Sequence, residues 1–380
     1  MLQRWRERLW SAWWPTLAQH RPLGPLATGL LRAVAALYGL IWRWRLARLD
    51  RPGHRPAQTS APVAGSVPVL VVGNPIVGGA GKTPAVIAVV ALLQGSGLRV
   101  GVISRGYGGS RSALPQPVTP DSDPATCGDE PVLIARRTGA PVWVGRDRPA
   151  VLAALLAAQP GTQIVVSDDG AQHLPLRRSA VLWVLDERGV GNARLLPAGP
   201  LREPWPLALA GDARRDQAAA SGAPAPHWLL YNAPQPSTSE PGFLATRALG
   251  RPVPLADWLA AKPLGDDAAA AAAAAASAPP GVLPLALAGL AHPDKFFALL
   301  REQGHAFTPA PLPDHAAWDD APWRQHPAWQ PGTPLWVTEK DAVKLRPGHA
   351  RGELPPTWVW PLELALPPAL AREVLAWALV

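Results

Sequence analysis

Short apolar, β-branched runs alternate with longer apolar stretches between about residue 67 and residue 168. Each run is bounded by glycine, proline or charged residues, which is typical of a strand followed by a turn and a helix. The predicted strands are 69–72, 99–104, 142–144 and 163–167, and the predicted helices are 84–94, a segment after Pro131, and 150–158. Strands and helices that alternate at this spacing indicate an α/β fold, a P-loop-type parallel sheet with helices on both faces.

The pattern divides the rest of the chain. Residues 1–50 form a helical segment, residues 50–65 a Pro/Gly/Ser-bearing linker, and residues 66–260 the main α/β core. The pattern weakens after residue 205, where 210–226 and 232–242 are loop-like, and the alanine-rich 268–280 stretch is a linker or insertion. It resumes with a strand at 282–290, a helix at 293–303 and a strand at 335–337. We therefore expect a smaller C-terminal α/β lobe over residues 281–380.

Charge changes the interpretation of the N-terminal segment. The chain carries a net charge of +8, and residues 1–55 hold ten arginines against Glu7 and Asp50, so this segment accounts for the whole excess. Six tryptophans are interleaved with the arginines, namely Trp5, Trp10, Trp13, Trp14, Trp42 and Trp44. Arginine with interfacial tryptophan favours a membrane surface over nucleic acid.

Helical spacing supports a membrane-associating amphipathic helix. Arg32 and Arg43 share one face, and an apolar set lies opposite them: Leu30, Val34, Leu37 and Ile41. Packing of this apolar face on the protein's own core remains the alternative. Because Pro22, Pro25 and Arg32 interrupt the apolar run, we do not expect a clean transmembrane span.

Two further observations concern the compartment. Cys127 is the only cysteine, which excludes an internal disulfide and zinc clusters built on cysteines. The pattern of a secretory signal peptide is not evident. We expect a location facing the cytosol.

The chemistry is concentrated after the strand at 69–72. Gly78, Gly79 and Gly81 allow the backbone to curl so that successive N–H groups can point at one anion. Lys82 then supplies a positive charge and Thr83 a hydroxyl for Mg²⁺, in the manner of a phosphate-binding loop. Because proline is tolerated in the first turn of a helix, Pro84 fits a helix that opens there.

One departure from the phosphate-loop pattern is Ile76, which stands where the usual motif has glycine. An accidental glycine-rich turn is the competing interpretation, although strand, glycines, Lys-Thr and helix start coincide here. Partition and targeting ATPases carry a lysine just before the paired glycines, whereas this chain has Val77. Val77 therefore weakens the alternative of a membrane-peripheral switch ATPase acting on a protein partner.

Three acidic residues and one histidine are candidates for the remaining chemistry. Asp168 and Asp169 follow a buried strand, where acidic residues order Mg²⁺ in P-loop enzymes, although they could merely cap a turn. Asp129 could be a helix N-cap or a general base, and the sequence leaves the two even. His315, by spacing alone, is an exposed loop histidine.

Nine strings occur in chain order: VGN at 72–74, GGAGKTP at 78–84, SRGYG at 104–108, GDEP at 128–131, DDGAQH at 168–173, LLPAGPLREP at 195–204, AGLA at 288–291, PDH at 313–315 and TEKDAVK at 338–344. Together they resemble one family, the tetraacyldisaccharide 4′-kinases of Gram-negative envelope synthesis. The strings span nearly the whole chain. LLPAGPLREP is the most specific, since no generic nucleotide fold requires it.

The resemblance implies transfer of the ATP γ-phosphate to the 4′-hydroxyl of a tetraacyldisaccharide 1-phosphate at the cytoplasmic face of the inner membrane. It implies ATP and Mg²⁺ as cofactors, the lipid disaccharide and the membrane surface as partners, and neither nucleic acid nor an obligate protein partner. Asp129 then resembles the catalytic base paired with His315, and Lys82 takes part in catalysis.

The remaining roles also follow from the resemblance. The nucleotide-binding residues are Asn74, Gly78, Gly79, Ala80, Gly81, Lys82, Thr83 and Gln172; the metal ligands are Thr83, Asp168 and Asp169; the substrate-binding residues are Tyr107, Arg148, His173 and Glu203. Ala171 and Ala316 stand where the family pattern has aromatic or ring-bearing residues. These departures concern local packing and remove no charged group.

Overall fold

The computed structural model describes residues 2–14, 23–48, 67–110, 114–206, 224–260, 279, 281–314, 316, 318 and 321–379. The expected linker at 50–65 and the alanine-rich stretch at 268–276 lie outside these residues.

Two compact units make up the chain, and both are interrupted in sequence. The first contains residues 1–105, 147–246 and 365–380, and the second contains residues 106–146 and 247–364. The boundaries differ from the simple N-to-C order that the sequence suggested. Residues 106–146, placed in the core by their pattern, cluster instead with the C-terminal lobe.

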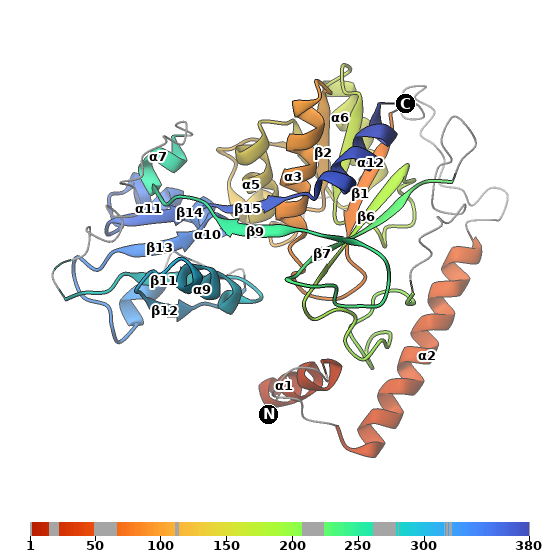
Figure 1. The fold of residues 1–380 in the computed structure, drawn as a ribbon, viewed down its shortest axis with the longest axis horizontal. Helices are drawn as coiled ribbons and strands as arrows, with labels where there is room; N and C mark the ends of the chain where they lie inside the picture. The colour runs from red at the N-terminus through yellow and green to blue at the C-terminus, as the bar shows by residue number, and fades with distance from the viewer. Residues whose placement is uncertain are drawn as a thin grey trace. The chain divides into compact units, whose positions relative to one another are not determined.

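The first unit is an α/β unit (Figure 1). Its elements are α1 (Leu2–Trp13), α2 (Pro25–Arg48), β1 (Val69–Gly73), α3 (Lys82–Gly95), β2 (Val100–Ser104), α6 (Arg148–Ala158), β5 (Ile164–Asp168), β6 (Ala180–Asp186), β7 (His227–Asn232), β8 (Phe243–Leu244) and α12 (Pro368–Ala378). The strands lie in the order β2-β5-β1-β6-β7-β8, and each of these neighbouring pairs is parallel.

The central strands of this unit are apolar because both of their faces are covered. Every residue of β1, β2, β5 and β6 is buried, as is typical of central parallel strands. Helix α3 contacts β1, β2 and β5, α6 contacts β2, and α12 contacts α3. The order of the strands brings the ends of β1, β5, β6 and β7 to one edge of the sheet.

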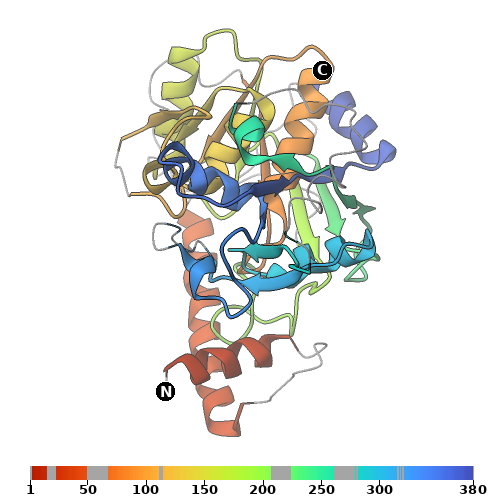
Figure 2. The same cartoon turned by 90° about the vertical axis from the view of Figure 1, so that its left-hand side faces the viewer.

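Helix α2 is one continuous helix of 24 residues (Figure 2). Pro25 opens it instead of interrupting it, since a first-turn proline has no N–H bond to lose. The helix is long and apolar enough to cross a membrane by length and composition, which the sequence argument did not expect. One face is buried through Ala35, Gly39 and Trp42.

The second unit is also α/β. Its elements are β3 (Gln116–Val118), α4 (Pro124–Cys127), α5 (Asp129–Thr138), β4 (Val142–Val144), β10 (Val253–Pro254), α7 (Leu255–Leu259), β11 (Leu285–Ala288), α9 (Pro293–Glu302), β12 (Thr308–Pro311), η1 (Pro322–Gln325), β13 (Leu335–Thr338), α10 (Glu339–Ala342), η2 (Val343–Leu345), α11 (Arg346–Ala350) and β14 (Thr357–Trp360). A five-stranded sheet runs in the order β10-β14-β13-β11-β12. β3 and α4 lie within the stretch 110–126, which the sequence suggested was a polar loop.

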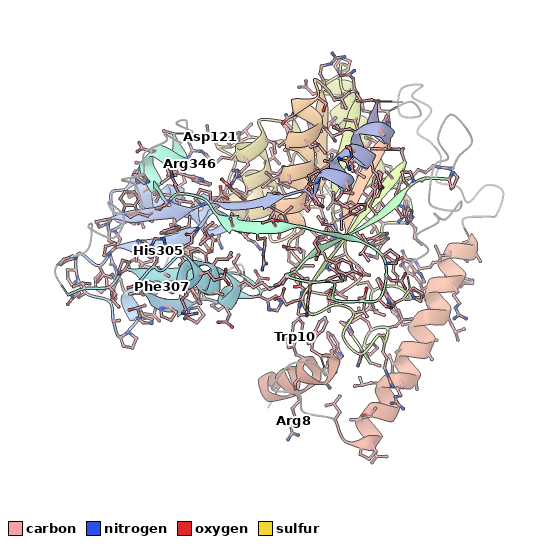
Figure 3. All side chains as sticks on the ribbon, in the orientation of Figure 1. Arg8, Trp10, Asp121, His305, Phe307 and Arg346 are labelled. Atoms are coloured by element: carbon pink, nitrogen blue, oxygen red, sulfur yellow. The ribbon has the colours of Figure 1, made fainter. Side chains whose placement is uncertain are left out.

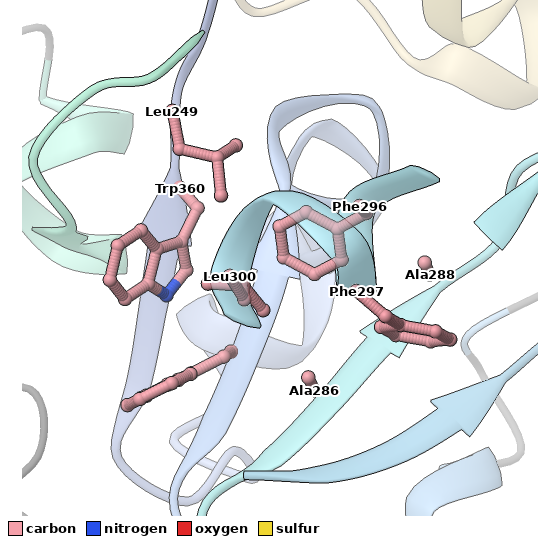
Figure 4. Packing of buried hydrophobic residues seen from close by; sticks show 8 residues of the cluster. Leu249, Ala286, Ala288, Phe296, Phe297, Leu300 and Trp360 are labelled. Atoms are coloured by element: carbon pink, nitrogen blue, oxygen red, sulfur yellow. The ribbon is translucent and has the colours of Figure 1, made fainter. Parts of the chain in front are cut away.

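An aromatic core holds α9 on this sheet (Figure 4). Phe296, Phe297 and Leu300 of α9 pack with Trp336 of β13 and Trp360 of β14. The rings of Trp336 and Trp360 lie 5.1 Å apart at 57°. Tilted pairs at this distance stabilise a core beyond simple area burial.

The chain passes from one unit to the other four times, and two of these passages fall within paired strands, β9 (Thr246–Leu249) and β15 (Leu362–Ala365). The first unit is therefore completed by residues that follow the second unit in sequence.

Candidate active site

The phosphate loop begins where β1 ends at Gly73 and closes at the start of α3. Gly78 and Gly81 have φ values of +89° and +82°, a region that side chains with a Cβ rarely adopt. Gly81 is the N-cap of α3, and a Cβ there would overlap the Asn232 amide. The helix N-terminus, with its unpaired N–H groups and positive dipole end, therefore opens at the loop.

Scaffold side chains hold three consecutive carbonyl groups of this loop. Asn74 Nδ2 donates to Gly78 O at 3.3 Å, and Arg188 Nη2 donates to Gly79 O at 2.7 Å. Asn232 Nδ2 donates to Ala80 O at 3.0 Å. In a trans peptide the C=O of one residue and the N–H of the next residue point in opposite directions. Each of these three hydrogen bonds therefore turns the N–H of the following residue away from the side chain that donates the bond. The N–H groups of residues 79 to 81 are thus directed away from the scaffold, as an anion cradle requires.

Ile76 has a structural role that accounts for the missing glycine. It is fully buried and forms a bridge with Leu201. Val77 N donates to Pro200 O at 2.9 Å, and Arg202 N donates to Pro75 O at 2.7 Å. The LLPAGPLREP segment thus pairs with the lead-in to the loop, which gives that string a physical role.

Lys82 lies among the predicted site residues. Its Nζ donates to Asn74 Oδ1 at 3.0 Å and lies 3.8 Å from Asp169 Oδ2. Arg202 Nη1 contacts the same Asp169 oxygen at 3.3 Å. Burial acts to raise the pKa of Asp169, but Lys82, Arg202 and Arg148 together hold that pKa below its usual value. The carboxylate therefore remains ionised.

Asp168 ends β5 beside the phosphate loop, and Asp169 directly follows the strand. The β1–β5 register pairs Val72 with Asp168, and Ser104 Oγ donates to Asp168 Oδ2 at 2.9 Å. Among the described residues, no group of three or more His, Cys, Asp or Glu gathers as metal ligands. Two carboxylates near the threonine of a phosphate loop still supply the oxygen donors that Mg²⁺ prefers.

Arg148 and His173 lie next to this pair. Arg148 is buried, and its Nη2 donates to Asp169 O at 2.6 Å. Burial, followed by the charge of Arg148, lowers the pKa of His173 to about 4, so the ring is neutral at neutral pH. His173 can therefore line the site as a polar but uncharged side chain.

Gln172 and Glu203 are joined directly. Gln172 Nε2 donates to Glu203 Oε1 at 2.8 Å and to Asn74 O at 3.2 Å. Arg202 Nη1 contacts Gln172 Oε1 at 3.4 Å. These bonds link the DDGAQH and LLPAGPLREP strings to the strand end at Asn74.

In the second unit, Asp129 is the first residue of α5, with Gly128 as the N-cap. The carboxylate is buried and lies 3.9 Å from Lys344 Nζ and 4.0 Å from Lys340 Nζ. The N-cap interpretation is thus wrong, although Asp129 Oδ1 accepts a bond from Glu130 N at 2.9 Å. The two ammonium groups compensate a charge that burial would otherwise make costly.

The two lysines are themselves held in place. Lys344 Nζ lies 2.9 Å from Asp341 Oδ1, and Lys340 Nζ lies 3.3 Å from Glu130 Oε1 and 3.4 Å from Asp314 Oδ1. Burial acts to lower the pKa of Lys340, but Glu130, Asp129 and Asp314 raise it above its usual value. Lys340 therefore carries a positive charge beside Asp129.

The chain matches the family model described as tetraacyldisaccharide-1-P 4′-kinase over residues 27–378. It is 44% identical to the tetraacyldisaccharide 4′-kinase of Leptothrix cholodnii, over 97% of this chain and 94% of that protein. It is 46% identical to that of Methylibium petroleiphilum, over 91% and 88%. This chain belongs to the tetraacyldisaccharide-1-P 4′-kinase family.

A solved structure supports the fold of this kinase family. A crystal structure described as LpxK from Aquifex aeolicus in complex with ATP aligns with a TM-score of 0.65 at 23% identity, covering 92% of this chain and 99% of that chain. The α/β fold class is therefore confirmed, and the family match with its curated relatives confirms the kinase interpretation. Membership in a phosphotransferase family overrides the switch ATPase alternative.

The predicted site residues fall into two groups in this family member. The first unit brings together the loop, both aspartates and four further residues, namely Asn74, Arg148, Gln172 and Glu203. Asp129 and Tyr107 belong to the second unit, where the Tyr107 side chain is 64% exposed. His315 lies outside the described residues, so its pairing with Asp129 stays a prediction.

Sequence reasoning missed Arg188, Asn232 and the lysines beside Asp129 as site residues. Asn232 ends β7, and Arg188 follows the end of β6, so both lie at the sheet edge that carries the predicted motifs. Asp186 and Asn232 are register partners there. A polar residue at the end of an apolar strand was the signal that could have identified Arg188 and Asn232, because β6 and β7 are also apolar runs that end at this edge of the sheet.

Proposed function

We propose that this chain transfers the γ-phosphate of ATP to the 4′-hydroxyl of a tetraacyldisaccharide 1-phosphate at the cytoplasmic face of the inner membrane. The observation that carries the proposal is the loop whose consecutive carbonyls, at residues 78 to 80, are all held by scaffold donors. That arrangement presents N–H groups and Lys82 to a polyphosphate.

Asp129 is the proposed base. A buried carboxylate with two lysine ammonium groups about 4 Å away can accept the proton of an acceptor hydroxyl as the oxygen attacks phosphorus. His315, by the family pattern, assists this step.

Thr83 and Asp168, with Asp169, would hold Mg²⁺ through oxygen atoms. The ion, when bound, neutralises charge on the phosphates. Asp169 is also bound to Lys82 and Arg202, which places further positive charge at the site. Gln172 would contact the nucleotide, while Tyr107, Arg148, His173 and Glu203 would contact or orient the substrate.

Helix α2 supports the membrane assignment. A set of large apolar side chains on its outer face is exposed: Leu26, Leu30, Val34, Leu37, Leu40, Ile41 and Trp44. At 100° per residue they share one arc of the helix, opposite the buried Ala35 and Trp42. A peripheral or shallowly inserted helix would cover this arc with lipid, where the acyl chains of the acceptor also reside.

The decisive experiment measures ATP consumption with and without the lipid disaccharide 1-phosphate and identifies the product. We expect consumption to depend on the acceptor and to yield the 4′-phosphorylated lipid. Equal ATP hydrolysis without the acceptor would contradict the proposal.

A further inference from the structure

Arg188 contacts the phosphate loop, and two tryptophan rings lie against its guanidinium group. Arg188 Nε donates to Oδ1 and Oδ2 of Asp186, both at 3.0 Å, and Nη2 donates to Gly79 O at 2.7 Å. The guanidinium lies 4.9 Å from the Trp14 ring centroid and 5.8 Å from that of Trp10. Asp186 and Trp14 are fully buried, and Arg188 is 6% exposed.

Helix α1 is attached to the segment that also supports the loop. Trp13 Nε1 donates to Pro197 O at 3.1 Å, and Asn192 N donates to Trp13 O at 2.8 Å. Trp10 and Arg8 lie on opposite sides of α1, with Trp10 turned toward the loops of the first unit (Figure 3). Three of the tryptophans that the sequence suggested were interfacial, Trp10, Trp13 and Trp14, thus contact the protein.

The contact at Gly78 leaves little room for a larger side chain. A Cβ built on Gly78 would lie 3.2 Å from Arg188 Nη1 and 3.3 Å from the Trp10 ring. These distances are shorter than most real Cβ contacts. The loop, the guanidinium and the indole are therefore packed as one layer.

Arg188 controls one peptide plane of the cradle. Its bond fixes the Gly79 carbonyl, and trans geometry then fixes the direction of the Ala80 N–H. Asp186 orients the guanidinium from one side, and the two indole rings exclude water and attract the cation from another. Loss of the rings would let water compete for the guanidinium, and the Gly79–Ala80 plane would lose its anchor.

We propose that Arg188 is a positioning residue for the phosphate loop and that Trp10 of α1 and Trp14, which directly follows α1, hold it in place. This makes the N-terminal segment part of the nucleotide site. This inference rests on the proposed function of the loop as the ATP site. It predicts that α1 sets nucleotide affinity in addition to any role at the lipid surface.

The test measures the dissociation constant of a fluorescent ATP analogue for the full chain in detergent, without acceptor. Trp10→Ala is a suitable variant because Trp10 is only partly buried. Arg188→Lys is the second variant: it keeps the positive charge but loses the planar guanidinium that binds Asp186 and Gly79 O together. We expect each to weaken analogue binding by about three- to tenfold. Trp10→Phe, which keeps a ring, should restore most of the affinity.

Trp377→Ala is the matched control, because Trp377 is also a partly buried tryptophan of the first unit and pairs with Trp228 at 6.1 Å. It should leave analogue binding unchanged. The inference is overturned if folded Trp10→Ala and Arg188→Lys proteins bind the analogue like the parent chain, or if Trp377→Ala weakens it equally. Failure of the kinase proposal would show separately, as acceptor-independent ATP consumption by the parent chain.

Discussion

At the scale of the residue, the buried Asp129 carboxylate is placed between two lysines on α10 and η2. Helix α5 fixes its backbone, and the lysines are fixed by further carboxylates. A carboxylate held in this way is oriented before any acceptor binds, which is what efficient proton transfer requires.

Replacement of this base tests its role. Asp129→Asn should lower kcat by about 10² to 10⁴ and change the KM for ATP by no more than about twofold, because only the proton acceptor is removed. Steady-state kinetics with the lipid acceptor provide the measurement. Asp314→Asn, which also removes a partner of Lys340 but at a more exposed position, is the control. Unchanged turnover in Asp129→Asn would remove Asp129 from the base role.

His173 gives a prediction of pH-dependent stability. Its folded pKa is about 4 against 6.5 for the free side chain, so the unfolded chain binds more protons between these values. Stability should therefore rise by about 1 to 3 kcal/mol as the pH increases from about 4 to 6.5. In His173→Gln this increment should disappear from urea titrations across that range. The control is His349→Gln, at an exposed position on α11; an identical pH slope in parent and His173→Gln would contradict the prediction.

At the scale of the element, Ile76 stands where the usual phosphate-loop motif has glycine, and its side chain packs in the core instead of weakening the loop. Ile76→Gly would restore the usual motif but remove a fully buried side chain. We expect a loss of about 2 to 5 kcal/mol in the free energy of unfolding, measured by denaturant titration. Ile76→Val should cost about 0.5 to 1.5 kcal/mol. A glycine variant as stable as the parent would show that burial of the Ile76 side chain contributes nothing.

The sequence predicted the elements whose signal is local. Strands β1, β2, β4 and β5 were located to within about a residue at each end because each is an apolar run between breakers. Strand β7 was missed because its short run stands alone in a stretch of weak pattern. Lys82 and the aspartates follow from a motif, whereas Arg188 and Asn232 reach the loop only through the strand order, which no local pattern specifies.

At the scale of the whole molecule, the apolar face of α2 predicts lipid binding. Leu30→Glu with Leu37→Glu should reduce co-sedimentation with anionic vesicles by more than about tenfold, because each buried leucine contributes about 1.5 to 3 kcal/mol. The substituted side chains are 68% and 57% exposed, and Leu379→Glu at 60% exposure is the matched control. Equal vesicle binding by the double variant and the parent chain would exclude α2 as the docking surface.

The interleaving of the two units has a consequence for synthesis on the ribosome. Helix α12 belongs to the first unit, where it contacts α3 and where Glu373 accepts a bond from Trp228 Nε1 at 2.8 Å. The nascent chain can close its second unit while the first still lacks this helix. The unit that emerges first from the ribosome is therefore completed last. The apolar surface of α3 stays uncovered until α12 has been translated.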